Sequence, residues 1–139
     1  MTKTVRVFET GSVFKDILLE NMPQNIVWGN ENADFAVIMP GYNGPCGGNY
    51  GVLLKPDGFA CGDVSRTVIT YGMGKNSTVT LSSVGEKRCV MTLQQEMETI
   101  WGKLLEPQDI VISRMHLTPH DALAVAAAML IAGDEFTGI

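Results

Sequence analysis

Short apolar runs separated by turn residues make up the first third of the chain. Thr4 to Glu9 alternates between apolar and polar positions and is rich in β-branched residues, which predicts a strand. Ser12 then precedes apolar residues at helical spacing, which predicts a capped helix over residues 12–22. Two further runs, Asn25 to Trp28 and Asp34 to Met39, are typical of strands in a buried sheet.

The middle of the chain predicts further strands. Val52 to Lys55 is followed by a Pro-Asp-Gly turn and then by Phe59 to Cys61, so these two segments predict a hairpin. Thr67 to Tyr71 and Thr78 to Ser82 are β-branched segments joined by a glycine-containing link. Arg88 to Met91 adds another candidate strand after them.

A helical spacing of apolar residues follows. From Leu93 onward the apolar positions recur at intervals of four, seven and eight residues, the period of a helix with one buried face. Thr92 and Gln95 stand at capping-box spacing at the start of this segment. The pattern predicts a helix over residues 92–105, with Trp101 on its buried face.

The last predicted helix is apolar on every side. After a short strand at Ile110 to Ile112, Thr118 offers a cap and Pro119 stands at the first helical position, which predicts a helix over residues 118–132. Its sequence from Ala122 onward is almost free of polar residues, and such a helix must be buried all round. It therefore lies either beneath other elements of its own chain or in a subunit interface. The second alternative predicts a homo-oligomer.

The order of these elements predicts a single α/β domain over residues 1–139, with a mixed sheet and helices near 12–22, 92–105 and 118–132. A mostly antiparallel α+β sheet is the alternative. Hydrophobic residues make up 45% of the chain and charged residues 18%, a composition that predicts a packed core rather than disorder.

Charge and cysteine content narrow the possible partners. The net charge of −5 and the scattered Lys and Arg residues argue against a nucleic-acid partner. No apolar run is long enough to cross a membrane, so no membrane partner is predicted. The first residues carry no apolar signal core, and three cysteines fit reduced thiols, so a cytoplasmic location is expected.

Residues 41–51, GYNGPCGGNYG, hold five glycines in eleven residues directly after an apolar run. A strand followed by such a loop is typical of sites where a phosphate or another small anion lies against bare backbone. Neither GxxxxGK[ST] nor GxGxxG occurs, so the loop predicts a small anionic ligand, with a nucleotide as one candidate, and names no ligand. The predicted ligand-binding residues are Asn43, Gly44, Cys46, Gly47, Gly48 and Asn49 of the loop, together with His120 and Asp121 at the start of the last helix.

Two chemical alternatives depend on the cysteines. Cys46 in its glycine loop is a candidate nucleophile, with His116 or His120 as base, which is the arrangement of a cysteine hydrolase or transferase. The same residues with Cys61 have the side chains that zinc prefers, but their spacings match no finger, ribbon or knuckle. No catalytic residue, metal or cofactor is therefore assigned. The leading interpretation is a ligand-binding module without catalysis of its own, and an assembly subunit is the other alternative.

Three segments together resemble a known family. Val68 to Gly72, followed by Ser77 to Thr80, is similar to the strand and meander late in the central domain of Mur ligases. Asp121 to Ala128 resembles the alanine-rich helix that follows that meander, and Asp34 to Pro40 is similar to the apolar strand before it. Mur ligases join amino acids to peptidoglycan precursors using ATP.

The resemblance covers at most the second half of that domain, and the chain departs from the family pattern. It has no ATP P-loop, and Asp121 stands where the family has the asparagine that contacts adenine. The resemblance therefore implies a remnant or companion module that contacts a nucleotide or a ligase partner. It does not imply ligase activity.

Overall fold

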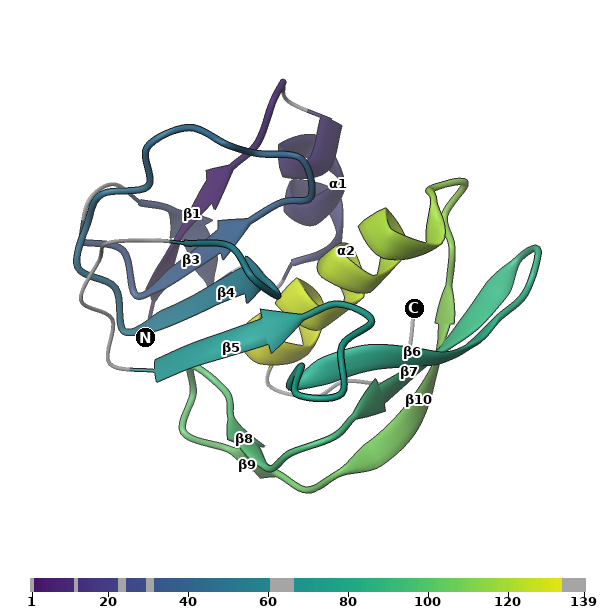
Figure 1. The fold of residues 1–139 in the computed structure, drawn as a ribbon. Helices are drawn as coiled ribbons and strands as arrows, with labels where there is room; N and C mark the ends of the chain where they lie inside the picture. The colour runs from purple at the N-terminus through teal and green to yellow at the C-terminus, as the bar shows by residue number, and fades with distance from the viewer. Residues whose placement is uncertain (1, 12, 23–24, 30–31, 61–66, 134–139) are drawn as a thin grey trace.

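A computed structural model describes residues 2–11, 13–22, 25–29, 32–60 and 67–133. These residues form an eight-stranded mixed sheet, a two-stranded ribbon and two helices (Figure 1), and they confirm the predicted α/β class. The helices are α1 (Val13–Asn21) and α2 (Pro119–Ala132), and the ribbon pairs β8 (Met97–Glu98) with β9 (Leu104–Leu105). The large sheet has the order β10-β7-β6-β5-β4-β3-β1-β2, with β1 (Lys3–Phe8), β2 (Ile26–Trp28), β3 (Phe35–Ile38), β4 (Val52–Pro56), β5 (Thr67–Tyr71), β6 (Val79–Val84), β7 (Arg88–Leu93) and β10 (Gln108–Ser113).

The sheet has a parallel part and an antiparallel part. Strands β2, β1, β3, β4, β5 and β6 pair in parallel, whereas β7 runs antiparallel to both β6 and β10. Parallel pairing brings the amino ends of β1, β3, β4 and β5 to one edge of the sheet and their carboxyl ends to the opposite edge. The segments immediately before these strands therefore lie close together, although they are far apart in the sequence.

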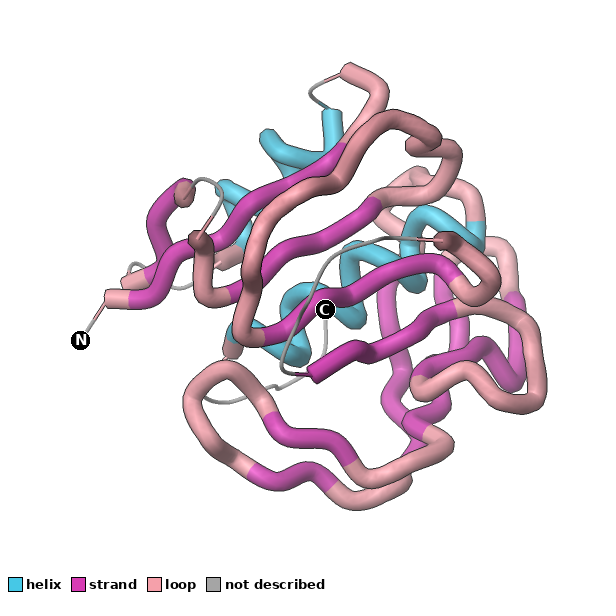
Figure 2. The backbone as a smooth tube through the Cα atoms, turned by 60° about the vertical axis from the view of Figure 1, so that its left-hand side comes forward, coloured by secondary structure: helices cyan, strands magenta, loops and turns pink. Residues whose placement is uncertain are grey.

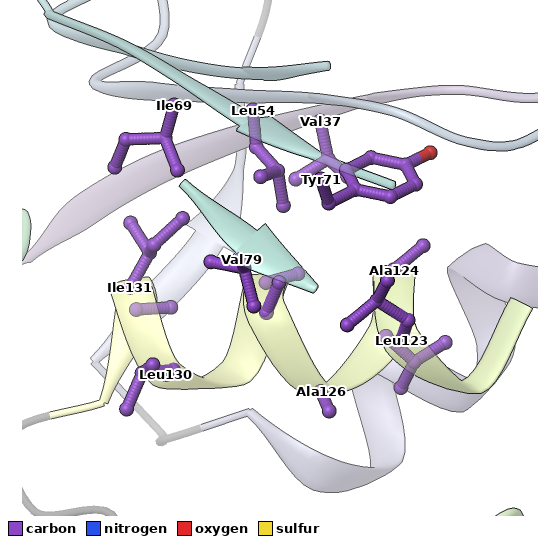
Figure 3. Close-up of a cluster of buried hydrophobic side chains, with 14 of the residues drawn as sticks. Val37, Leu54, Ile69, Tyr71, Val79, Leu123, Ala124, Ala126, Leu130 and Ile131 are labelled. Atoms are coloured by element: carbon purple, nitrogen blue, oxygen red, sulfur yellow. The ribbon is translucent and has the colours of Figure 1, made fainter. Parts of the chain in front are cut away.

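Helices α1 and α2 cover one face of the sheet (Figures 1 and 2). Alternate residues of the strands, such as Leu54 and Ile69, point toward α2 and are almost fully buried (Figure 3). Ten residues of α2 are also buried within this single chain, and small alanines let the helix lie close to the sheet. The first of the two alternatives for this helix is therefore confirmed, because α2 lies beneath other elements of its own chain.

The two helices begin with different caps. Thr118 Oγ1 accepts a 3.3 Å hydrogen bond from the amide of Asp121, as the sequence pattern predicts for α2. At α1 the Glu9 carboxylate accepts bonds from the amides of Phe14 and Lys15, at 3.1 and 2.6 Å. Partial burial raises the pKa of Glu9 despite these two bonds, because removing a carboxylate from water disfavours its charged form. The predicted cap, Ser12, lies outside the described residues.

The opposite face is covered by residues 39–51, which connect β3 to β4 (Figure 2). A crossover between parallel strands is almost always right-handed, so steps across the sheet in opposite directions use opposite faces. The step from β1 to β2 runs one way through α1, and the step from β3 to β4 runs the other way. The glycine-rich segment is therefore a crossover on the face away from α1, where Tyr42, Cys46 and Tyr50 pack on Ile38 and its neighbours.

The helix predicted over residues 92–105 is wrong. The chain there completes β7, forms β8, turns, and forms β9. Thr92 does not cap a helix, because its hydroxyl bonds across the sheet to Ser82 at 2.8 Å and to Asp109 at 2.7 Å. Gly102 has a φ of +83°, a left-handed value that ends a turn and interrupts any helix.

The hairpin predicted over residues 52–61 is also wrong. Its turn is present, since Phe59 N donates to Pro56 O at 3.0 Å, but Phe59 and Ala60 form no strand. Strand β4 instead pairs in parallel with β3 and β5. Because both edges of β4 are already paired, a returning strand has no edge to join. Cys61, the end of the predicted hairpin, lies outside the described residues.

Candidate functional site

A cavity of about 650 Å³ opens at the amino ends of the parallel strands. Five parts of the chain form its walls: the starts of β1, β3 and β5, the last residues of the glycine-rich crossover with the start of β4, and the turn between β8 and β9. This turn lies near the amino end of β5 in Figure 1. The charged, amide and aromatic side chains that line the cavity are those of Lys3, Asp34, Asn49, Tyr50, Glu98 and Trp101, together with Asn32.

The wall formed by the starts of β1 and β3 is held together by hydrogen bonds between Thr4 and Asp34. Asp34 Oδ2 accepts bonds from the amide and the hydroxyl of Thr4, at 2.9 and 3.1 Å, and the Asp34 amide donates back to Thr4 Oγ1 at 3.0 Å. Gly51 passes so close to this wall that a Cβ there would lie 2.9 Å from the Asp34 carbonyl oxygen. At this position glycine is required by packing, independently of any ligand.

The turn between β8 and β9, which forms one wall of the cavity, is held by hydrogen bonds within the turn and by hydrogen bonds to the end of α2. Thr99 is buried, and its Oγ1 accepts bonds from the amides of Trp101 at 3.3 Å and Lys103 at 3.2 Å. The turn is also tied to the end of α2, since the amide of Ile100 donates to Ile131 O at 3.1 Å. The Trp101 indole Nε1 donates to Ala132 O at 2.6 Å. The otherwise unpaired carbonyls at the end of α2 thus position the turn.

The crossover wall is anchored by Tyr50, which is only 1% exposed. Its hydroxyl donates to Gly47 O at 2.8 Å and accepts from Arg6 Nη1 at 3.1 Å. Arg6 also donates to Gly47 O at 3.3 Å and lies over the ring of Phe8, 4.6 Å from its centroid. A few polar contacts therefore hold the middle of the crossover against β1.

The charges around the cavity are mixed. Among the described residues that line it, Lys3 carries the one positive charge, and Asp34 and Glu98 carry negative charges. The Lys3 ammonium lies 5.9 Å from the centroid of the Trp101 ring. Such a lining provides one point charge for an anionic group and an aromatic surface for an apolar part, and its carboxylates disfavour ligands of high negative charge.

The structure spreads the predicted loop residues along the strands. Near the start of the crossover, Tyr42 lies against Phe8 at the carboxyl end of β1, with ring centroids 5.4 Å apart. Gly47 lies beside Arg6 in the middle of β1, and Asn49 reaches the cavity at the amino ends. Of the predicted ligand-binding residues in the loop, Asn49 lines the cavity. The other five lie earlier in the crossover and do not line it: Asn43, Gly44, Cys46, Gly47 and Gly48.

The other two predicted residues lie at the far end of α2. The ring of His120 packs against Tyr71, the last residue of β5, with centroids 5.6 Å apart. Burial, and secondarily the charge of Asp121, raises the pKa of Tyr71, which therefore stays neutral and donates to Ile38 O at 2.6 Å. Ten residues of helix separate Asp121 from Ile131 beside the cavity, roughly 15 Å at 1.5 Å per residue. His120 and Asp121 do not join Asn49 in one site.

The cysteines differ from the reduced set expected from the sequence. Cys46 is disulfide-bonded, and Cys89 is free and buried, so the expectation of three reduced thiols is wrong. A disulfide sulfur is not a nucleophile. Cys46 and His120 also lie on opposite faces of the sheet, because Cys46 packs on the crossover face and Tyr71, which contacts His120, packs on the helix face. Cys61 lies outside the described residues. Within the described part of the chain, no three His, Cys, Asp or Glu side chains gather around a possible metal position.

Of the seven lining residues named above, six were absent from the predicted site: Lys3, Asn32, Asp34, Tyr50, Glu98 and Trp101. The wrong helix over residues 92–105 placed Trp101 on its buried face. Lys3 and Asp34 stand immediately at the start of two predicted strands, and parallel pairing of those strands would have brought them together. The signal was therefore present in the sequence, but it required the strand order.

The family models, the curated proteins and the solved structures that were compared with the chain contain no match. The resemblance to Mur ligases therefore stays a prediction. Neither helix of the described residues has the length and apolar character needed to span a membrane.

Proposed function

We propose that this chain is a small-molecule-binding module without catalysis of its own, and that it binds a small anionic ligand in the cavity at the amino ends of β1, β3 and β4. The observation that carries the proposal is the cavity itself, with a volume of about 650 Å³ and walls from five separate parts of the chain. Ligand pockets typically measure about 300–1,000 Å³ and combine apolar surface with a few polar groups. The end of the glycine-rich crossover supplies one of these walls.

The lining favours a ligand of low negative charge. Lys3 offers an ammonium at the cavity, whereas the carboxylates of Asp34 and Glu98 repel additional negative charge. A nucleoside monophosphate is therefore a better candidate than a triphosphate. The resemblance to Mur ligases adds no support for a nucleotide in this cavity, because its adenine-contacting position, Asp121, lies at the other end of α2.

The test is a titration of the purified chain, followed by NMR of backbone amides, with a nucleoside monophosphate, the matching triphosphate and ribose 5-phosphate. We expect the amides of residues 49–52 and 98–102 to shift, and the monophosphate to bind more tightly than the triphosphate. Lys3→Met keeps the aliphatic stem and removes the charge, so it should weaken binding by up to about fivefold, the scale of one partly exposed charge contact.

Lys15→Met is the matched control for that variant. Lys15 also lies over a tryptophan ring, 5.0 Å from the centroid of Trp28, but it is not among the residues that line the cavity. Equal losses in the two variants would show a general charge effect and not a site at Lys3. Amides around the cavity that stay unmoved with all three compounds would contradict the proposal.

Three other predictions from the sequence concerned a cysteine-dependent enzyme, a homo-oligomer and a cytoplasmic location. The disulfide at Cys46 leaves no thiolate there for a hydrolase or transferase, so that activity is not proposed. A homo-oligomer stays a prediction, although the apolar surface of α2 that motivated it is covered within the chain. A cytoplasmic location also stays a prediction, and the disulfide weighs against it because such bonds persist mainly in oxidising compartments. Labelling of free thiols in fresh cell extract shows whether this disulfide is present in the cell.

A further inference from the structure

We infer that Trp101 is a stacking platform which makes the cavity selective for a ligand that carries a planar aromatic ring beside its anionic group. The inference rests on the proposed function, because it specifies the ligand of the same cavity. It concerns the one residue of the lining that combines a large aromatic surface with partial exposure: Trp101 is half-buried, whereas Tyr50 is almost completely covered.

The polar group of the Trp101 side chain is already used by the protein. The indole Nε1 donates a 2.6 Å bond to Ala132 O at the end of α2. A ligand therefore gains no hydrogen bond from this side chain. What Trp101 offers to the cavity is its π surface, which favours flat rings over saturated groups of similar size.

The position of the ring is set before a ligand arrives. Four hydrogen bonds help to hold the turn: the indole bond to Ala132 O, the Ile100 amide bond to Ile131 O, and the two amide bonds to the buried hydroxyl of Thr99. Gly102, with a φ of +83°, closes the turn directly after the tryptophan. A platform that is already ordered loses little conformational entropy on binding, so its contact contributes fully to affinity.

The location of Lys3 relates the ring to the charge. Its ammonium lies over the Trp101 ring, 5.9 Å from the centroid, so a ligand that stacks on this face takes the place of the ammonium. The flexible lysine stem allows the ammonium to move to the edge of the stacked ring. An anionic group attached to the ring, directly or through a short link, would then meet Lys3 while the ring lies on Trp101. The chemistry defined by this pair is that of a planar aromatic ring with one anionic group, which includes aromatic carboxylates, with one negative charge, and nucleoside monophosphates, with about two.

The test compares probes that differ only in the flat ring. Benzoate is paired with cyclohexanecarboxylate, and a nucleoside monophosphate with ribose 5-phosphate, and the dissociation constants are measured by NMR titration. We expect the aromatic member of each pair to bind about tenfold more tightly, the scale of one stacking contact. The indole N–H resonance of Trp101 in the wild-type chain should shift with the aromatic probes and stay in place with the saturated ones.

Variants of the two tryptophans assign this preference to its residue. Trp101→Leu should abolish the preference for aromatic probes, Trp101→Phe should retain part of it, and Trp28→Phe should leave it unchanged. Equal affinities within each pair, or a preference that survives in Trp101→Leu, would overturn the inference while leaving the proposed anion site intact. If no probe binds at all, the proposed function fails, and the inference fails with it. The wild-type indole resonance decides the matter even if Trp101→Leu does not fold.

Discussion

The two faces of the sheet are covered in different ways. On one face, α2 buries ten residues against the strands, and α1 extends that cover toward β1. On the other face, a crossover without helix or strand lies over β1, β3 and β4, with Tyr42, Cys46 and Tyr50 as its packed side chains. The first cover is a large apolar contact, and the second combines a small apolar cluster with a few hydrogen bonds.

This difference separates the part of the molecule that fixes the fold from the part that shapes the site. Apolar burial drives folding roughly in proportion to area, so the helix face should supply most of the stability. The crossover contributes less area, yet its last residues form one wall of the cavity. Binding residues are often carried on such segments, where a rigid scaffold positions a less densely packed loop.

The largest expected effect comes from opening the helix face. Leu123 in α2 is completely buried, so Leu123→Ala should lower the free energy of unfolding by about 2–5 kcal/mol, the range for buried leucines. Urea denaturation measures this loss. Affinity for the anionic probes should stay unchanged in the folded variant, because Leu123 lies in the half of α2 away from the cavity.

Val111→Ala is the control for that experiment. Val111 is 56% exposed on the edge strand β10, so its truncation should change stability by no more than about 0.5 kcal/mol. A comparable loss in both variants would mean that burial by α2 is not what distinguishes the helix face.

The helix face was largely predictable from the sequence. The cap at Thr118, the proline after it and the apolar run that follows are local signals, and they gave the start and end of α2 within a residue. The short apolar strands were found for the same reason. The prediction of a helix over residues 92–105 failed because Met97 and Trp101 match a helical period by coincidence. Gly102, which precedes β9, marks the turn that the chain forms instead.

The crossover face was not predictable to the same degree. Five glycines at residues 41–51 indicated an unusual backbone, but the need for them comes from distant parts of the chain. Gly51 must clear the carbonyl of Asp34, and Gly41 takes a φ of +84° as the chain leaves β3. Likewise the cavity depends on strand order, which brings Lys3 close to Trp101 although the two residues are far apart in the sequence.

An intermediate effect is expected from loosening the crossover. Tyr50→Phe keeps the ring and removes the hydroxyl that joins Gly47 O to Arg6, so it should cost about 0.5–1.5 kcal/mol of stability, the net value of a typical hydrogen bond. Hydrogen exchange at residues 43–49 should accelerate much more than exchange in α2. Affinity for the probes should fall in this variant, unlike in Leu123→Ala.

Tyr42→Phe is its matched control, since Tyr42 also bonds within the crossover but is half-buried and does not line the cavity. It should leave probe affinity unchanged. If Tyr50→Phe destabilises the protein as strongly as Leu123→Ala, the two faces do not differ in the way described above.

The smallest effect concerns Glu9, where β1 leads into α1 at the margin of the helix face. Burial raises the pKa of its carboxyl above the 4.5 of an unperturbed glutamate, and the amide bonds from Phe14 and Lys15 only partly offset this. The folded chain therefore keeps the Glu9 proton to a higher pH than the unfolded chain does. By linkage, this carboxyl stabilises the fold below pH 4.5, and that contribution is lost as pH rises through the folded pKa.

Glu9→Gln removes the titration and keeps one acceptor for the helix amides, so any lost hydrogen bond adds a constant offset to its stability. Urea unfolding of both proteins between pH 4 and 7 isolates the Glu9 contribution, since all other titrating groups are shared. The stability of the wild type relative to Glu9→Gln should decrease as pH rises from 4 toward 6. A difference that stays flat, or that grows with pH, would mean that the two amide bonds outweigh burial, and that α1 is anchored by a charged cap.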